Sequence, residues 1–281
     1  MNTPSRPRAT KIICTIGPAT DTSDMLGQLI EAGANVFRLN MSHSKHDWVR
    51  EVVFRIRRKA AELKANVAIL FDLQGPSIRT GDLLEPYHLK KGDTVEIRLG
   101  TAKPELPFST TVNYDGLLQD VQAGHTMVVD NGGILMRIAE VRPDRLICDV
   151  LTEGVFGSRR HINLPGVALR LPALTEKDLA DLAVAVECET DYVAMSFVRD
   201  AAHIAQLREH IDNLGGKAQI VAKIEDQQAV RHIDDIILAA DVIMVARGDL
   251  GIEVSIEELP IIQRRIVRHC HRLGRRCIVA C

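Results

Sequence analysis

Apolar residues along the chain gather into short runs that are separated by segments with helical spacing. The runs are rich in valine, isoleucine and other apolar residues with few polar interruptions, which is typical of strands buried on both faces of a parallel sheet. They cover residues 11–17, 35–42, 66–73, 192–198, 219–225, 241–246 and 276–281. This alternation of strands and helices predicts an α/β fold with parallel strands.

The segments between the runs carry helix-terminus signals. Residues 22–33 begin with the capping residues Thr22 and Ser23, which predicts a helix there. Thr175 is a predicted N-cap, because Asp178 three positions later places an acid in the first turn. Further helices are expected at residues 200–213, 226–239 and 256–273.

One stretch lacks the helical pattern. Residues 83–167 read as short strands punctuated by turns, and Asp-Asn-Gly-Gly at 130–133 predicts a hairpin turn. We therefore predict an all-β module at 83–167, inserted into an α/β domain formed by 1–82 and 168–281. Removing about 85 inserted residues from the 281 leaves about 196, whereas a complete eight-stranded barrel needs about 250. The residues alone leave two choices, an open doubly wound sheet or a barrel cut short.

Composition narrows the class of protein. The apolar content is 46%, the charged content is 26% and the net charge is −2, so no broad attraction to nucleic acid or anionic membrane is expected. The longest apolar neighbourhood, residues 236–246, contains Asp241 and is too short to span a bilayer. Six cysteines without a CxxC pair fit reduced thiols. We expect a cytoplasmic protein with no nucleic-acid or membrane partner.

Charged and polar side chains follow the predicted strands at their carboxyl ends, where parallel α/β folds gather functional groups. They are Pro18, Arg38, Asn40, Ser42, His43, Asp72, Arg79, Ser196, Arg199, Lys223, Glu225, Arg247 and Asp249. Arginines and a lysine together with carboxylates suit a polyanionic substrate that is held partly through a divalent metal.

Each of these residues also has a simpler interpretation. Lys223 and Glu225 share one face of a strand and could form a plain ion pair. Asp249 alone would suggest a helix cap, but beside Glu225 it could complete a Mg²⁺ site, since two adjacent carboxylates without a cation repel. His43 alone reads as a solvated histidine, and Asp130 as a turn aspartate. No nucleophile–base triad, Walker loop or GxGxxG motif occurs in the sequence.

The strand-end motifs resemble those of the pyruvate kinase family, in the family's order and from about Thr10 to Cys281. They are TKIICTIGPAT, GANVFRLNMSH, ILFDLQGPSIRTG, INLPGV, LPALTEKD, YVAMSFVR, AKIEDQ and IMVARGDLGIE. The resemblance implies a (β/α)₈ barrel of the TIM type with a β-rich lid inserted after strand three. Family members continue past residue 281, so the expected fold is a barrel truncated within strand seven, completed by self-association or by a partner chain.

The resemblance also implies an activity, the transfer of the phosphoryl group of phosphoenolpyruvate to ADP, giving pyruvate and ATP in the final step of glycolysis. Lys223 would neutralise charge on the moving phosphoryl group. Arg38 and Arg79 would bind phosphate. Glu225 and Asp249 would hold Mg²⁺ or Mn²⁺.

Other site residues are carried over from the same motifs. A monovalent cation would be bound by Asn40, Ser42, Asp72 and Leu73. The substrate pocket would include Ala246, Arg247, Gly248 and Ser196. The nucleotide would be bound by Arg38, His43, Pro18 and Arg160, the last of which is usually lysine in the family. Asp130 matches a lid aspartate that closes over the site.

Two departures from the family pattern leave alternatives open. Leu73-Gln74 resembles potassium-independent relatives, but those typically carry lysine where Ser77 stands, so a role for K⁺ stays open. A threonine near the reacting carbon would fall at Cys281. Besides the phosphotransferase, two functions remain: a catalytically weak fragment that binds nucleotide or phosphoenolpyruvate, and a Mg²⁺-dependent pyruvate aldolase.

Overall fold

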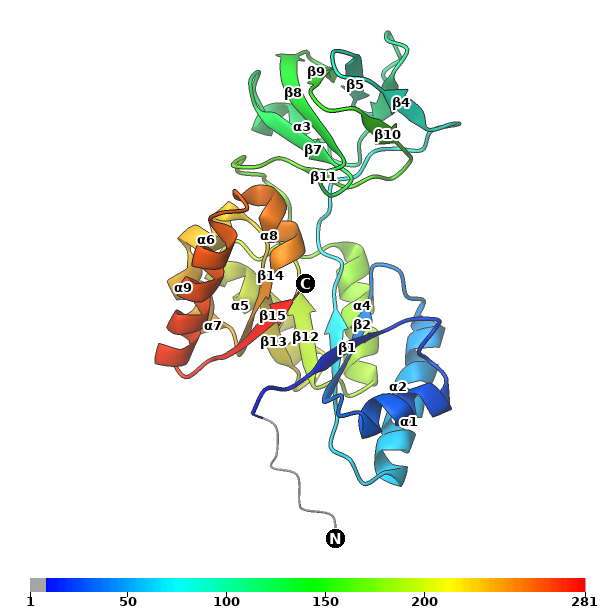
Figure 1. Ribbon diagram of the computed structural model, residues 1–281, viewed down its shortest axis with the longest axis vertical. Coiled ribbons are helices and arrows are strands. Elements are labelled where there is room, and N and C mark those ends of the chain that lie inside the picture. The colour runs from blue at the N-terminus through cyan, green and yellow to red at the C-terminus, as the bar shows by residue number, and fades with distance from the viewer. Residues whose placement is uncertain (1–8, 281) are drawn as a thin grey trace. The chain divides into compact units, whose positions relative to one another are not determined.

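The seven predicted strands form one sheet in a computed structural model that describes residues 9–280 (Figure 1). Its order follows the chain, β1-β2-β3-β12-β13-β14-β15. The bounds are β1 Ile13–Ile16, β2 Val36–Asn40, β3 Ala68–Asp72, β12 Tyr192–Met195, β13 Gln219–Ile224, β14 Val242–Ala246 and β15 Arg276–Ala280. A doubly wound sheet reverses its strand order at a switch point. The unbroken order therefore confirms a barrel-type α/β fold. Cys281, the predicted position of the threonine near the reacting carbon, lies outside the described residues.

The register of the first strands determines which strand-end residues are neighbours. β1 pairs in parallel with β2, with Thr15 opposite Arg38. β2 pairs in parallel with β3, with Asn40 opposite Asp72. Because parallel strands end at the same edge of the sheet, this pairing places four polar side chains close together.

Helices connect the strands as the pattern predicted, with some differences in detail. Their bounds are α1 Ser23–Glu31, α2 His46–Glu62, α4 Glu176–Glu187, α5 Ala201–Asn213, α6 Gln227–Arg231, α7 Ile233–Ala239, α8 Arg247–Glu253 and α9 Leu259–Arg272. The predicted caps Thr22 and Thr175 are confirmed: the Thr22 hydroxyl accepts the N–H of Met25, and Thr175 forms a reciprocal capping box with Asp178. Ser23, also predicted to cap, is instead the first residue of α1.

Two helical predictions were incomplete, and one helix was not predicted. The predicted helix 226–239 is two helices, α6 and α7, which meet at His232, whose ring bonds the carbonyl of Arg199 (2.9 Å). The predicted helix 256–273 begins later, at Leu259, and the chain forms the extra helix α8 before it. The long helix α2 was not predicted, although Val49, Val52, Val53, Ile56 and Ala60 give it a buried face with helical spacing.

The chain divides into two compact units. The first contains the residues up to Gly75 together with 174–196 and 204–221, and the second contains 76–173, 197–203 and the chain from Ala222 onward. In the first unit, α1 and α2 pack against each other beside β1 and β2 (Figure 1). In the second, α9 packs against β14, β15 and α7. The domain boundaries at 82/83 and 167/168 stay a prediction.

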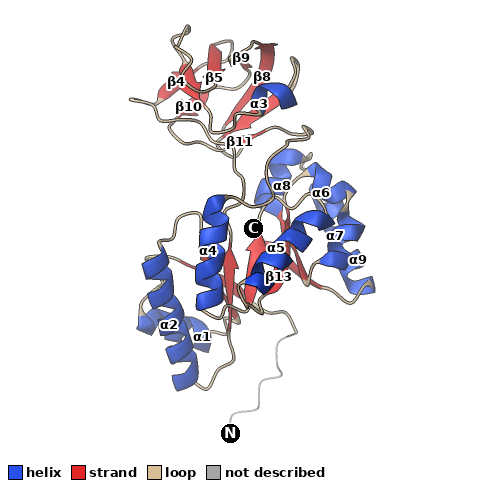
Figure 2. Ribbon diagram, turned by 180° about the vertical axis from the view of Figure 1, so that it is seen from behind, coloured by secondary structure: helices blue, strands red, loops and turns tan. Residues whose placement is uncertain are grey.

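The β-rich part of the second unit contains two sheets and, among its described residues, the short helix α3 Leu117–Asp120 (Figure 2). The six-stranded sheet has the order β11-β7-β8-β9-β5-β6, and β10 pairs with β4. The bounds are β4 Tyr87–Leu89, β5 Thr94–Arg98, β6 Ser109–Thr111, β7 Thr126–Val129, β8 Ile134–Val141, β9 Arg145–Val150, β10 Gly154–Phe156 and β11 Ile162–Asn163. The predicted hairpin joins β7 to β8, and φ is positive at Asp130 (57°), Asn131 (53°) and Gly132 (98°).

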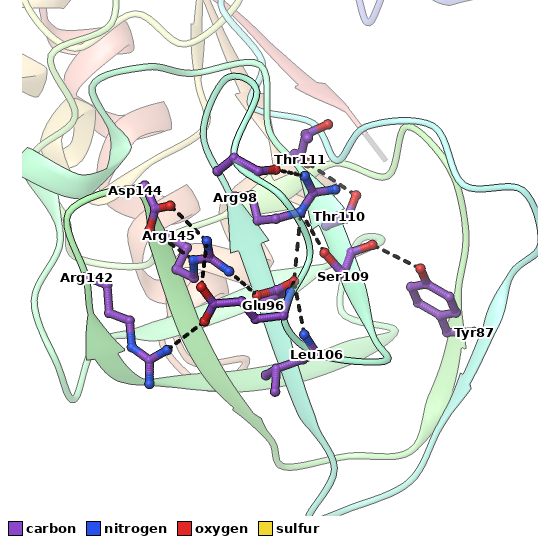
Figure 3. Close-up of polar contacts among 12 residues, drawn as sticks. Tyr87, Glu96, Arg98, Leu106, Ser109, Thr110, Thr111, Arg142, Asp144 and Arg145 are labelled. Carbon is purple, nitrogen blue, oxygen red and sulfur yellow. Dashed lines mark hydrogen bonds and ion pairs between the residues drawn. The ribbon is translucent and has the colours of Figure 1, made fainter.

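A buried ion pair lies within this β-rich part (Figure 3). Glu96 is fully buried, and its Oε2 lies 2.8 Å from Nη1 of Arg145. The other carboxylate oxygen accepts the backbone N–H groups of Glu105 (2.7 Å) and Leu106 (3.3 Å). A buried carboxylate is tolerated only when its lone pairs are satisfied in this way. The network therefore holds the loop at 105–106 against β5 and β9.

Candidate active site

In the first unit, Arg38 and Asp72 form the most closely bonded pair of predicted site residues. Nε of Arg38 donates to Oδ2 of Asp72 (2.7 Å), Nη2 lies 2.6 Å from the same oxygen, and Nη1 donates to the hydroxyl of Thr15 (2.9 Å). Asp72 is 1% exposed, whereas the Arg38 side chain is 26% exposed. A guanidinium that is oriented by a buried acid and remains partly exposed can receive an anion.

The residues predicted to bind a monovalent cation lie at the same strand ends. Oδ1 of Asn40 accepts the N–H of Ser42 (3.1 Å). The Ser196 hydroxyl donates to the carbonyl of Leu73 (2.8 Å), and the N–H of Leu73 donates to the carbonyl of Ala194 (3.0 Å). Ser196 is thus buried and bonded to the segment that follows β3. Its predicted contact with substrate stays a prediction.

Two residues predicted to bind nucleotide are exposed. Pro18 follows β1, and His43 follows β2 with its N–H donating to the carbonyl of Asn40 (3.4 Å). Exposure keeps them accessible to a ligand, and their predicted roles stay untested.

In the second unit, Lys223 and Glu225 form a buried ion pair at the end of β13. Nζ of Lys223 lies 2.9 Å from Oε1 of Glu225, and the N–H of Phe197 donates to Oε2 (2.6 Å). Burial raises the pKa of Glu225 to about 7, Lys223 opposes that rise, and the charge of Asp249 adds to it. The carboxylate form is therefore disfavoured unless a further positive charge is close.

Asp249 lies inside α8, in its first turn, so the simple helix-cap interpretation is wrong. The N-cap position is Ala246, which makes no side-chain cap bond. Ala246 is buried and Gly248 is exposed. Nε of Arg247 donates to the carbonyl of Ala280 (2.8 Å), which ties the start of α8 to the end of β15. The sequence predicted that the strand ending at Ala246 leads directly into site residues. In the structure these residues form the first turn of α8, which begins at Arg247.

Arg79 lies in the second unit and is bonded within the β-rich part. Its Nη1 donates to the carbonyl of Arg159 (3.1 Å) and its Nε to the hydroxyl of Ser77 (3.2 Å). Burial lowers the pKa of His161, Arg79 lowers it further, and Asp249 opposes both. His161 was missed from the sequence, although it directly precedes the INLPGV motif. Its imidazole is half-buried and lies within electrostatic reach of Arg79 and Asp249.

The two lid residues form a pair at the hairpin. Nη1 of Arg160 lies 3.3 Å from Asp130, and both side chains are about 40% exposed, at 44% and 37%. An ion pair this exposed contributes little to stability. It keeps the guanidinium near the hairpin turn, and a nucleotide contact stays a prediction.

A cavity of about 240 Å³ lies within the second unit, and Glu225 contributes to its wall. Its other polar lining residues are His161, Asn163, Arg199, Asp226, Gln227, Gln228, Arg231, His232 and Glu253. Of these only Arg199 was singled out by sequence reasoning. Asn163, Asp226, Gln227 and Glu253 lie within the quoted motifs but were given no role there, because the cavity brings together segments that are far apart in the chain.

The donor set fits a magnesium ion. A divalent cation beside Glu225 and Asp249 would favour the carboxylate that burial and mutual repulsion disfavour. Among residues 9–280, no group of three or more His, Cys, Asp or Glu side chains is arranged to hold a metal. The remaining ligands would therefore come from water and substrate, as is usual for Mg²⁺ beside phosphates.

The chain-ordered parallel sheet and the separate β-rich part define a barrel-type α/β protein. A family model described as "Pyruvate kinase, barrel domain" matches residues 7–281, and the chain belongs to the pyruvate kinase family. In the part of the chain that the structure describes, no helix is long and apolar enough to cross a membrane.

Curated relatives share this family. The chain is 40% identical over 280 residues to "Plastidial pyruvate kinase 2" of Arabidopsis thaliana. The matched region covers 99% of this chain and 48% of that relative. It is 39% identical over 273 residues to "Pyruvate kinase" of Clostridium perfringens, and that match covers 96% of this chain and 58% of the relative. It is 40% identical over 277 residues to "Pyruvate kinase" of Geobacillus stearothermophilus, and that match covers 97% of this chain and 47% of the relative. The chain thus spans about half the length of the curated relatives it matches.

Proposed function

We propose that the chain carries the phosphoenolpyruvate-binding and phosphoryl-transfer site of a pyruvate kinase. The observation that carries the proposal is the buried Lys223–Glu225 pair at the end of β13, with the charge of Asp249 close enough to raise the pKa of Glu225. A lysine held beside a carboxylate in a nearly dry site is suited to neutralising charge on a phosphoryl group in transfer.

In the proposed reaction, an oxygen of the terminal phosphate of ADP attacks phosphorus and the bond to the enolate oxygen breaks. The enolate then takes up a proton to become pyruvate. Lys223 neutralises negative charge while the phosphoryl group moves. Arg38 and Arg79 bind phosphate oxygens.

The ions would be held by oxygen ligands. Glu225 and Asp249 would hold Mg²⁺ or Mn²⁺, which when bound supplies positive charge for the enolate and carboxylate oxygens. Asn40, Ser42, Asp72 and Leu73 would offer oxygens to K⁺. Replacing K⁺ by a bulky organic cation in the rate assay decides whether this second ion is needed.

The remaining contacts belong to the two substrates. The backbone at Ala246, Arg247 and Gly248, with Ser196, would bind the carboxylate of phosphoenolpyruvate. Pro18, His43 and Arg160 would bind the nucleotide, and Asp130 would approach it from the lid.

The test is a coupled assay in which lactate dehydrogenase reports pyruvate formed from phosphoenolpyruvate, ADP and Mg²⁺. We expect Lys223→Met to lower kcat by at least a hundredfold, as loss of a transition-state electrostatic group does. Lys217→Met, at an exposed lysine just before β13, should leave the rate unchanged. Full activity in Lys223→Met would refute the role of Lys223. Calorimetric binding of phosphoenolpyruvate without any product would instead support the binding fragment.

A further inference from the structure

Glu253, the last residue of α8, has a carboxyl group that was not among the predicted site residues. The backbone N–H of Gly166 and the side chain of Asn163 lie close enough to this carboxyl group to lower its pKa, and all three residues line the same cavity. Burial raises its pKa to about 7, and the charge of Asp226 adds to that rise. The carboxyl group therefore lies at a cavity wall, beside polar groups of a segment about 90 residues earlier in the chain.

The same residue is tied on its backbone side. Nε2 of Gln227 donates to the carbonyl of Glu253. Gln227 comes two residues after Glu225, so this bond joins the end of α8 to the segment that begins with the buried ion pair. Asn163, Glu225, Gln227 and Glu253 all line the 240 Å³ cavity. Three chain segments therefore meet at this one glutamate.

Helix geometry connects Glu253 to Asp249. The two residues are four positions apart in α8, which places both side chains on the same face, one turn from each other. α8 has seven residues, and its N-cap makes no side-chain hydrogen bond. Its start is held by the bond from Arg247 to Ala280, and its end by the bond from Gln227 to the carbonyl of Glu253. The bonds at Glu253 therefore help to determine the direction in which Asp249 points.

We propose that Glu253 is a positioning residue for the cation site: its bond to Gln227 and its contacts with Asn163 and Gly166 hold α8 in the rotation that aims Asp249 toward Glu225. This inference rests on the proposed function, because it assumes that Glu225 and Asp249 bind the cation. Residues that orient metal ligands typically change metal affinity by about 10–100-fold when removed. In the proposal, Glu253 orients the metal ligand Asp249 in this way, so its removal should change metal affinity by a similar factor.

The test measures Mn²⁺ binding directly, by the electron paramagnetic resonance signal of free Mn²⁺, above the pKa of Glu253. We expect Glu253→Ala to raise the Mn²⁺ Kd about tenfold or more, and Glu253→Gln, which keeps an acceptor for Gly166, to raise it less. Asn163→Ala, which removes the amide group beside the Glu253 carboxyl group, should also raise the Mn²⁺ Kd. The matched control is Glu257→Ala, an exposed glutamate past the end of α8, which should bind as the wild type does.

Thermal unfolding separates positioning from simple stabilisation. A purely structural role would lower the unfolding temperature and leave the Mn²⁺ Kd of the folded protein unchanged, and that result would overturn the proposal. Unchanged Mn²⁺ binding in the folded Glu253→Gln and Asn163→Ala variants would overturn it as well, even if Glu253→Ala failed to fold. If Glu225→Gln binds Mn²⁺ like the wild type, the proposed cation site itself is wrong and the inference falls with it.

Discussion

Replacing Asp178 should destabilise the first unit far more than an ordinary helix-cap substitution. Asp178 is fully buried. Its Oδ1 accepts the N–H of Gly75 (3.0 Å), and its Oδ2 accepts the N–H (2.8 Å) and the hydroxyl (2.6 Å) of Thr175. One carboxylate thus caps α4 and also holds the segment that follows β3, which begins at Leu73.

The expected magnitude follows from the groups that Asp178→Ala leaves behind. The buried N–H of Gly75 loses its partner, which costs about 1–3 kcal/mol. The loss of half of the capping box costs about 1 kcal/mol more. The free energy of unfolding should therefore fall by about 2–4 kcal/mol. Thr175→Ala, which leaves the Gly75 bond intact, should cost only about 1 kcal/mol.

Urea unfolding followed by tryptophan fluorescence measures this difference. Trp48 is the single tryptophan of the chain and lies in α2, in the same unit, so its signal reports the relevant transition. Glu176→Ala is the control, since Glu176 is an exposed acid in the first turn of α4 and should change stability by less than about 0.5 kcal/mol. If Asp178→Ala costs no more than Thr175→Ala, the bond to Gly75 contributes nothing and the reasoning is refuted.

Two further predictions concern the second unit. Because burial raises the pKa of Glu253 from 4.5 to about 7, the folded state holds a proton that the unfolded state releases, so this group's contribution to stability falls as pH rises between those values. Glu253→Gln should therefore gain stability relative to the wild type from pH 4.5 to 7 in urea titrations, and a constant difference would contradict the burial of that carboxyl. Gly132 has a φ of 98°, so Gly132→Val should lower stability by about 1–2 kcal/mol or more. Asn131→Gly, at a φ of 53°, should be neutral or stabilising, and equal effects of the two changes in thermal unfolding would refute the turn assignment.

Much of the candidate site could be predicted because its residues stand at recognisable places in the strand pattern. Arg38, Asp72, Lys223 and Glu225 lie within or at the ends of predicted strands, and the structure pairs them as Arg38–Asp72 and Lys223–Glu225. Glu253 could not be found in this way. Its role depends on Asn163 and Gly166, which come about 90 residues earlier in the chain and have no pattern that links them to it.

The sequence by itself determined the local elements of this protein. The strands, the caps at Thr22 and Thr175, and the hairpin at 130–133 depend on neighbours within a few residues, where side-chain size and backbone preference act directly. Tertiary structure decided the rest. It set the raised pKa of Glu225, the break between α6 and α7 at His232, and the bond from Gly75 to Asp178 across 103 positions. Burial and hydrogen bonding between distant segments exist only once the chain has folded, because desolvation and partner geometry are properties of the packed structure.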